Sequence, residues 1–242
     1  MSLFAIGDLH LSFGDGVDKP MDIYGGPWVS HAEKLRKHWQ DAVSPEDTVI
    51  IPGDISWGMH LREAISDLTW IARLPGKKVL MKGNHDLWWS SLAKMNGIHE
   101  SLFFLHNNCF EGSNFVLAGS RGWLCPGSND FNEESDRKIY ERELIRLNLS
   151  LVQAQKIIEE NRLQGVEKKL ICALHFPPTN ERKHASGFTD AFERAGAQHV
   201  VYGHLHGTSA YANGLVGTRR GVTYTLCSLD KLNAVPYRVL GS

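Results

Sequence analysis

Short apolar runs alternate with helical periodicity in the first third of the chain. Leu3–Gly7, Thr48–Ile51 and Lys78–Lys82 are aliphatic runs that end at polar or glycine positions, so we predict three buried strands. Helices are predicted between them, over about residues 31–43 and over Leu61–Leu74, where a Pro-Gly pair follows. The order strand, helix, strand, helix, strand predicts a parallel sheet with right-handed crossovers.

The ends of two helices carry recognisable signals. Ser30 followed by Glu33 is a capping-box pattern, which predicts the start of the first helix. Asn132 is the expected N-cap of a long helix over about residues 133–162, within a helical segment of about 131–165, and Gly165 is its expected stop. The apolar residues of this helix alternate steps of four and three, which predicts one face packed on the core: Tyr140, Leu144, Leu147, Leu151, Ala154 and Ile158.

The second half of the chain is richer in strands than the first. We find no internal repeat, low-complexity segment or linker, so we expect residues 1–242 to form a single α/β domain with two packed mixed sheets flanked by helices. A short helix is expected over Thr189–Ala195. The further strands that we predict are Phe103–Leu105, Phe115–Ala118, Leu170–Leu174, His199–Tyr202, Ser209–Tyr211, Val222–Leu226 and Tyr237–Leu240.

Composition and charge narrow the class of protein. The chain is 42% hydrophobic and 22% charged, as in ordinary soluble proteins, and its formal net charge of -1 argues against a dedicated nucleic-acid binder. Its four cysteines show no Cys-x-x-Cys spacing, which favours buried reduced thiols. No signal-peptide core or membrane-spanning run is present in this sequence, so we expect a cytoplasmic protein without a membrane partner.

Five short motifs offer carboxylate, imidazole or amide side chains, and four of them come at the ends of apolar runs. Each alone is a weak signal, but loop residues at strand ends of an α/β sheet converge on one crevice. Together the motifs supply enough ligands for two metal ions. In chain order they are Asp8-Leu9-His10, Gly53-Asp54, Gly83-Asn84-His85-Asp86, His175 and Gly203-His204-Leu205-His206.

The order and composition of these motifs resemble the calcineurin-like metallophosphoesterase superfamily. The resemblance extends from Asp8 to His206 and implies a four-layer α/β/β/α sandwich that hydrolyses a phosphate ester. The ligands that it implies are Asp8, His10 and His206 for a first metal ion, Asn84, His175 and His204 for a second, and Asp54 as a bridge.

Two residues beside these ligands have implied or open roles. His85 matches the family's non-ligand histidine, which donates a proton to the leaving oxygen or stabilises the transition state. Asp86 either orients His85 or a neighbouring ligand, or is simply a turn residue.

Oxygen and imidazole ligands without thiolate favour two divalent or mixed-valence ions of Mn, Fe or Zn. Such a pair polarises the phosphoryl oxygens and holds a bridging hydroxide in line with the leaving group. The sequence does not choose among the three metals.

Residues that face the substrate are harder to assign. Arg121, in Gly-Ser-Arg-Gly-Trp after a predicted strand, either clamps a phosphate with its two nitrogens or lies in a surface turn. The tryptophans near the motif loops, Trp57, Trp88, Trp89 and Trp123, either wall a pocket or belong to the core.

Two departures from family subgroups narrow the expected activity. Protein Ser/Thr phosphatases extend the second motif as Gly-Asp-x-x-Asp-Arg-Gly, whereas Trp57 and Gly58 occupy the Asp and Arg positions here, which argues against a protein phosphatase. The lipid A pathway pyrophosphatases carry Gly-Asn-Arg-Asp where this chain has His85, which argues against that assignment too.

These observations predict a dinuclear phosphoesterase that acts on a small phosphorylated molecule. We favour a phosphodiester over a phosphomonoester, because no second arginine is evident to neutralise a dianionic phosphate. Two alternatives stay open: a catalytically idle scaffold of the same fold that binds protein partners, and a nuclease of the same superfamily. The sequence leaves the natural substrate and the oligomeric state undetermined.

Overall fold

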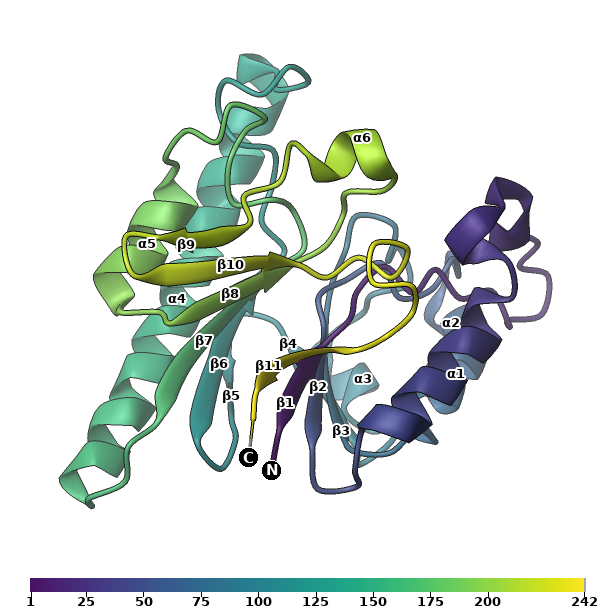
Figure 1. Ribbon diagram of the computed structural model, residues 1–242, viewed down its shortest axis with the longest axis horizontal. Helices are drawn as coiled ribbons and strands as arrows, with labels where there is room; N and C mark the ends of the chain where they lie inside the picture. Colours follow the sequence, from purple (N-terminus) through teal and green to yellow (C-terminus); the bar gives the residue numbers. More distant parts are fainter. Residues whose placement is uncertain (242) are drawn as a thin grey trace. The chain divides into compact units, whose positions relative to one another are not determined.

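The computed structural model describes residues 1–241, and the residues group into two compact units (Figure 1). Unit 1 comprises Met1–Phe104 and Cys227–Ser242, and unit 2 comprises Leu105–Leu226. Residue 242, the last of the expected domain, lies outside the described part. That the whole chain forms a single domain stays a prediction.

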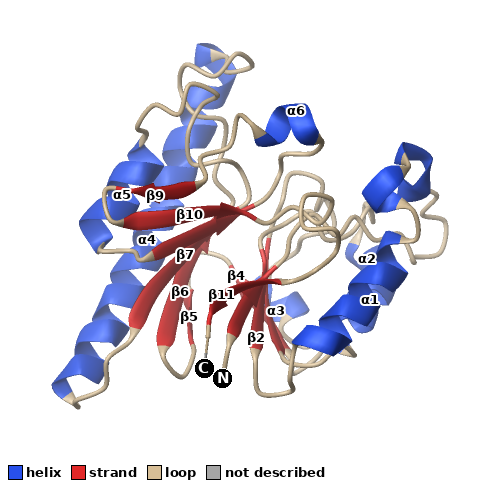
Figure 2. Ribbon diagram, viewed as in Figure 1, coloured by secondary structure: helices blue, strands red, loops and turns tan. Residues whose placement is uncertain are grey.

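Unit 1 is built on a five-stranded mixed sheet in the order β11-β1-β2-β3-β4, labelled in Figure 1 and drawn among the red strands of Figure 2. β1 pairs with β2 and β2 with β3 in parallel, whereas β11 runs antiparallel to β1. The strands are β1 (Leu3–Ala5), β2 (Thr48–Ile51), β3 (Lys77–Met81), β4 (Leu102–Leu105) and β11 (Tyr237–Leu240). The helices are α1 (His31–Ala42), α2 (Leu61–Ala72) and α3 (Leu92–Met95), with 3₁₀ turns η1 (Met21–Tyr24) and η2 (Gly26–Trp28).

The capping of the two longer helices of unit 1 differs from the sequence prediction at their N-terminal ends. Ser30 precedes α1 with a left-handed backbone (φ 51°) and makes no side-chain cap, so the expected capping box is wrong. At the start of α2, the Glu63 carboxylate instead accepts hydrogen bonds from the backbone nitrogens of Met59 and His60. A capping box is therefore present at α2 and not at α1, where the Ser30–Glu33 pattern predicted it.

The Lys78 side chain caps the C-terminal end of α2. Its side chain is fully buried, and Nζ donates to the carbonyl oxygens of Ala72 (3.0 Å), Leu74 (2.7 Å) and Gly76 (2.8 Å). These are carbonyls at and just beyond the end of α2, which lack helical partners of their own. Burial lowers the pKa of Lys78 to about 8.

Unit 2 contains a six-stranded mixed sheet in the order β5-β6-β7-β8-β10-β9, with four parallel strands between two antiparallel edges. Its strands are β5 (Cys109–Glu111), β6 (Phe115–Ser120), β7 (Lys169–Leu174), β8 (His199–Tyr202), β9 (Gly217–Arg219) and β10 (Val222–Leu226). Its helices are α4 (Glu133–Leu163), α5 (Gly187–Ala195) and α6 (Thr208–Tyr211). The predicted strand Ser209–Tyr211 is thus wrong, because α6 occupies it.

The long helix α4 follows the prediction closely. Asn132 caps it, since its side chain accepts from the backbone nitrogens of Glu134 (2.9 Å) and Ser135 (3.1 Å). Tyr140, Leu147 and other residues of the apolar stripe are buried against the sheet of unit 2.

Each unit has its own apolar core. In unit 1, Leu35 and Trp39 of α1 and Leu68 of α2 pack with Phe4 and Ile51 of the sheet. Alternate strand residues that face away from these helices, such as Leu3, Ala5 and Ile50, are also buried, which explains why the strands read as continuous apolar runs. Two mixed sheets flanked by helices were expected, and this prediction is confirmed.

All four cysteines are free thiols, and burial raises the pKa of Cys125 to about 12. In residues 1–241, we find no helix with both the length and the apolar character needed to cross a bilayer.

Candidate metal centre

Unit 1 places its predicted ligands at the carboxyl ends of three adjacent parallel strands. Asp8 and His10 follow β1, Asp54 follows β2, and Asn84 follows β3. Because parallel strands end at the same edge, their loops gather these side chains in one place. One ligand atom of Asp8 and one of His10 lie within 4.8 Å of each other, and His10 Nε2 lies 3.8 Å from Asp54 Oδ2.

These side chains are almost inaccessible to water. Asp8 is 0%, His10 3% and Asp54 1% exposed. Burying carboxylates costs free energy unless a cation or hydrogen-bond donors compensate them. The donor set, carboxylate and imidazole without thiolate, suits divalent metal ions, so the residues present fit a metal site.

The backbone at the ligands adopts an unusual conformation. Asp8 (φ 57°), His10 (φ 45°), Asp54 (φ 50°) and His204 (φ 73°) all have positive φ, which residues with a Cβ adopt only at a cost in free energy. Such outliers concentrate at functional sites, where the surrounding structure holds them in place. The sequence carried no signal of this conformation.

Asp86 ties the loop after β2 to the loop after β3. Its carboxylate accepts hydrogen bonds from the backbone nitrogens of Gly83 (2.7 Å), Ile55 (2.8 Å) and Ser56 (3.2 Å), and from Trp88 Nε1 (2.9 Å). Burial, followed by the nearby charge of Asp54, raises the pKa of Asp86 well above its ordinary value. Asp86 therefore positions the backbone that carries Asp54 and Asn84.

Gly83 and Asp54 are in close contact. A Cβ on Gly83 would lie 2.1 Å from Asp54 Oδ1 and 2.3 Å from its backbone nitrogen, so only glycine fits. The same carboxylate oxygen accepts a hydrogen bond from the backbone nitrogen of His85 (2.9 Å). The Gly-Asn-His-Asp segment thus wraps around the Asp54 carboxylate.

His85 differs from the ligands because its side chain is exposed. Its ring centroid lies 4.6 Å from that of Trp57, which itself stacks on His10 at 4.7 Å. His85 also lines a pocket of about 350 Å³ together with Trp57 and Leu87. The sequence analysis named Trp57 as a candidate pocket residue but did not name Leu87. The one sequence signal for Leu87 is that an apolar residue directly follows the polar segment Asn84-His85-Asp86.

Unit 2 places its predicted ligands after β7 and β8. His175 follows β7 directly and is fully buried, whereas His204 and His206 follow β8 and are half-buried. His175 and His204 offer ligand atoms within 4.8 Å of each other, with their ring centroids 5.1 Å apart. Phe176 packs on the ring of His204, with centroids 4.1 Å apart.

Arg121 lies close to this group through its backbone. Its carbonyl oxygen accepts from the backbone nitrogens of His175 and Phe176, both at 3.0 Å. Its guanidinium lies over the ring of Trp123 (4.6 Å), and Nη2 lies 3.6 Å from Oε1 of the buried Glu143 on α4. A role for Arg121 in binding phosphate stays a prediction.

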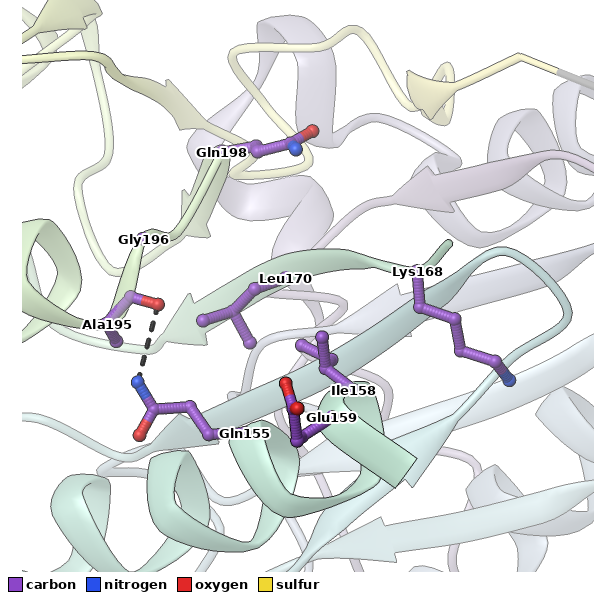
Figure 3. A pocket seen from close by; sticks show the side chains of 8 residues that line it. All are labelled: Gln155, Ile158, Glu159, Lys168, Leu170, Ala195, Gly196 and Gln198. Carbon is purple, nitrogen blue, oxygen red and sulfur yellow. Dashed lines mark hydrogen bonds between the residues drawn. The ribbon is translucent and has the colours of Figure 1, made fainter. Parts of the chain in front are cut away.

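Two pockets of unit 2 differ in their relation to the predicted ligands. One of about 240 Å³ is lined by His204 with Leu124, Thr179 and Leu205 among others. The other, of about 420 Å³, lies between α4 and the end of α5 and contains no predicted ligand (Figure 3). Its lining includes Gln155, whose Nε2 donates to the carbonyl oxygen of Ala195. Only the first pocket is connected to the predicted site.

Comparison with known proteins extends these observations. In sequence, residues 1–208 match the calcineurin-like phosphoesterase family. In structure, the chain is similar to a phosphopantetheinyl hydrolase from Mycobacterium tuberculosis, with a TM-score of 0.54 and 14% identity over 100% of this chain and 96% of that one. This likeness shows a shared fold.

Two phage proteins match shorter stretches. The Gene 66 protein of Mycobacterium phage L5 is 46% identical over 56 residues, which are 23% of this chain and 27% of that protein. Its counterpart in Mycobacterium phage D29 is 39% identical over 79 residues, or 33% and 37% of the two chains. The chain thus spans 27% and 37% of the length of these two relatives. From the family match over residues 1–208, the chain belongs to the calcineurin-like phosphoesterase family.

Proposed function

We propose that this protein is a dinuclear phosphoesterase that hydrolyses a small phosphodiester. Asp8, His10 and His206 would hold one divalent ion, Asn84, His175 and His204 the other, and Asp54 would bridge them. The observation that carries the proposal is the buried Asp8, His10 and Asp54 group, held on a left-handed backbone at three strand ends. When bound, two such ions supply Lewis acidity and an activated water.

Proton donation and the positioning of the ligands would be the roles of other side chains. His85, exposed and next to a pocket, would donate a proton to the leaving oxygen. Asp86 would keep Asn84 and Asp54 in register through its hydrogen bonds to both loops. Phe176, packed on His204, would limit the rotation of that imidazole.

The charged side chains support a diester over a monoester. A dianionic monoester would call for additional cations. The arginines near Glu143, namely Arg121, Arg142 and Arg146, all lie within 4 Å of its carboxylate, which partly neutralises them.

The test is to measure metal content and hydrolysis on the same preparations. Protein reconstituted separately with Mn, Fe or Zn should bind about two metal ions per chain by elemental analysis. It should hydrolyse small diesters faster than the matching monoesters. Less than one ion per chain after reconstitution would refute the dinuclear site, and two ions without any hydrolysis would favour the idle scaffold. Activity confined to polynucleotides, and steeply reduced by salt, would indicate a nuclease.

A further inference from the structure

The pocket beside His85 in unit 1 has apolar walls. Trp57, Met59, Leu87 and Val17 line it, and Met59 and Leu87 are 57% and 56% exposed. A single exposed leucine is ordinary, but here several large apolar side chains surround one pocket next to a predicted catalytic residue. Such a wall gains free energy when an apolar group covers it.

The turn after β3 presents His85 and Leu87 together. The backbone nitrogen of Leu87 donates to the carbonyl oxygen of His85 (2.8 Å), which fixes the two residues in one tight turn. The ring of Trp57 also lies beside that of His85, with centroids 4.6 Å apart. An imidazole that protonates a leaving group in this position must do so next to an apolar pocket.

The charged groups of the pocket do not alter this character. The Glu63 carboxylate is occupied by the backbone nitrogens of Met59 and His60. Asp18 and Lys19 are exposed and opposite in charge. The pocket therefore offers no concentration of positive charge for a leaving group with further phosphates.

We infer that this pocket holds the leaving group of the substrate, and that this leaving group is an apolar alcohol. The inference rests on the proposed function, because it takes His85 as the proton donor. An oxygen atom from water would form a new bond to phosphorus while the bond from phosphorus to the leaving oxygen breaks. The His85 imidazole would give its proton to that leaving oxygen, so that the products are the neutral alcohol and a phosphate monoester. Trp57, Met59 and Leu87 would then determine specificity for that alcohol.

The first test measures binding without turnover. Benzylphosphonate and methylphosphonate cannot be hydrolysed at their phosphorus–carbon bond, so calorimetry on the metal-loaded protein compares the two groups directly. We expect benzylphosphonate to bind about tenfold or more tightly, given the apolar area that it buries. Leu87→Ser should reduce this preference about threefold to tenfold. The matched control is Leu149→Ser on α4, a leucine that is 50% exposed and outside the pocket, which should leave the preference unchanged.

The second test measures turnover and separates this inference from the proposed function. Methyl benzyl phosphate and methyl propyl phosphate release alcohols of similar basicity, so any difference in kcat/KM reports on the pocket. Hydrolysis of both esters at equal kcat/KM, or equal effects of Leu87→Ser and Leu149→Ser, would overturn the inference and leave the phosphoesterase intact. Absence of hydrolysis, with a benzyl preference that still depends on Leu87, would refute the proposed function and retain the apolar site. Equal binding of the two phosphonates refutes the inference in either case.

Discussion

The two units hold their predicted ligands by different means. In unit 1, hydrogen bonds join the ligand loops to one another, with Asp86 and Asp54 as the acceptors. In unit 2, the ligand histidines are supported by aromatic packing, as Phe176 lies on His204, and by single backbone contacts such as Gly203 to His175. Unit 1 also carries more of the strain, since three of the four left-handed ligands belong to it.

This difference shows how preorganisation is divided within the chain. Hydrogen bonds to a carboxylate fix both distance and direction, so the unit 1 ligands are held even before a cation arrives. Packing of rings restricts rotation but is less directional. Substitutions in the ligand loops can test whether unit 1 holds its ligands rigidly.

The largest effect is expected from Asp54→Asn. Loss of the charge that we propose bridges the ions should weaken metal binding and abolish hydrolysis, whereas the apolar core should keep the protein folded. Elemental analysis, circular dichroism and an assay on bis-p-nitrophenyl phosphate would check this. Asp41→Asn, on the exposed face of α1, is the control. Wild-type turnover in the Asp54 variant would show that this assignment is wrong.

A smaller but still large effect is expected from Gly83→Ala. The added Cβ cannot fit 2.1 Å from Asp54 Oδ1, so it should push Asp54 and His85 apart and weaken metal binding by about tenfold or more, a cost of about 1.4 kcal/mol. A metal titration followed by calorimetry measures this. Gly97→Ala is the matched control, because nothing lies within 4 Å of its added Cβ. Equal affinities in the two variants would mean that the Asp54 loop is adaptable.

His85→Ala and His204→Ala should separate a proton donor from a ligand. His85→Ala should retain metal and lower kcat by about 10²–10⁴-fold for an alkoxide leaving group, with a smaller loss for p-nitrophenolate, which needs no proton. His204→Ala should lose metal and activity on both substrates. If His85→Ala also strips the metal, His85 is a ligand, and unit 1 contributes one more than we propose.

Lys78→Met should affect stability and leave catalysis by the folded protein unchanged. The substitution removes the Lys78 hydrogen bonds to three carbonyl oxygens, of which Ala72 O keeps a bond from Ser101 Oγ (3.3 Å), and this loss should lower the free energy of unfolding by about 1–3 kcal/mol in a urea titration. Lys37→Met, at an exposed surface pair, should change stability by less than about 0.5 kcal/mol.

The same residue predicts a pH dependence. With the pKa of Lys78 lowered from 10.5 to about 8, the unfolded chain retains a proton between these values that the folded chain has released. The free energy of unfolding should therefore rise with pH over this window, and Lys78→Met should flatten the rise. An equal slope in both proteins would contradict the lowered pKa.

Much of the fold could be predicted from the sequence, because apolar periodicity is a local property. The strands Thr48–Ile51, His199–Tyr202, Val222–Leu226 and Tyr237–Leu240 were predicted with their exact bounds, and α4 within a residue. The strand predicted over Ser209–Tyr211 is wrong, since a pattern of three residues cannot distinguish a strand from a helical turn. The capping box predicted at Ser30 is wrong because a cap depends on the backbone angles of the capping residue, which the sequence pattern does not encode.

The candidate site, too, could be predicted only in part. The ligand types and their order could be read from five motifs, since residue identity is what metal chemistry selects. The fourfold hydrogen bonding of Asp86 and the contact between Gly83 and Asp54 depend on loops that meet from distant parts of the sequence. Leu87 beside His85 could not be assigned either, because exposure follows from the folded turn.

The left-handed backbone at Asp8, His10, Asp54 and His204 has a consequence for how this protein can change by mutation. Each such residue costs the metal-free fold about 1–3 kcal/mol, and glycine at the same position would avoid most of that cost. Selection for stability alone would therefore favour glycine at these positions, and each replacement would delete a ligand. A stabilised descendant of this chain that had lost its chemistry would be recognisable by glycines at these four positions.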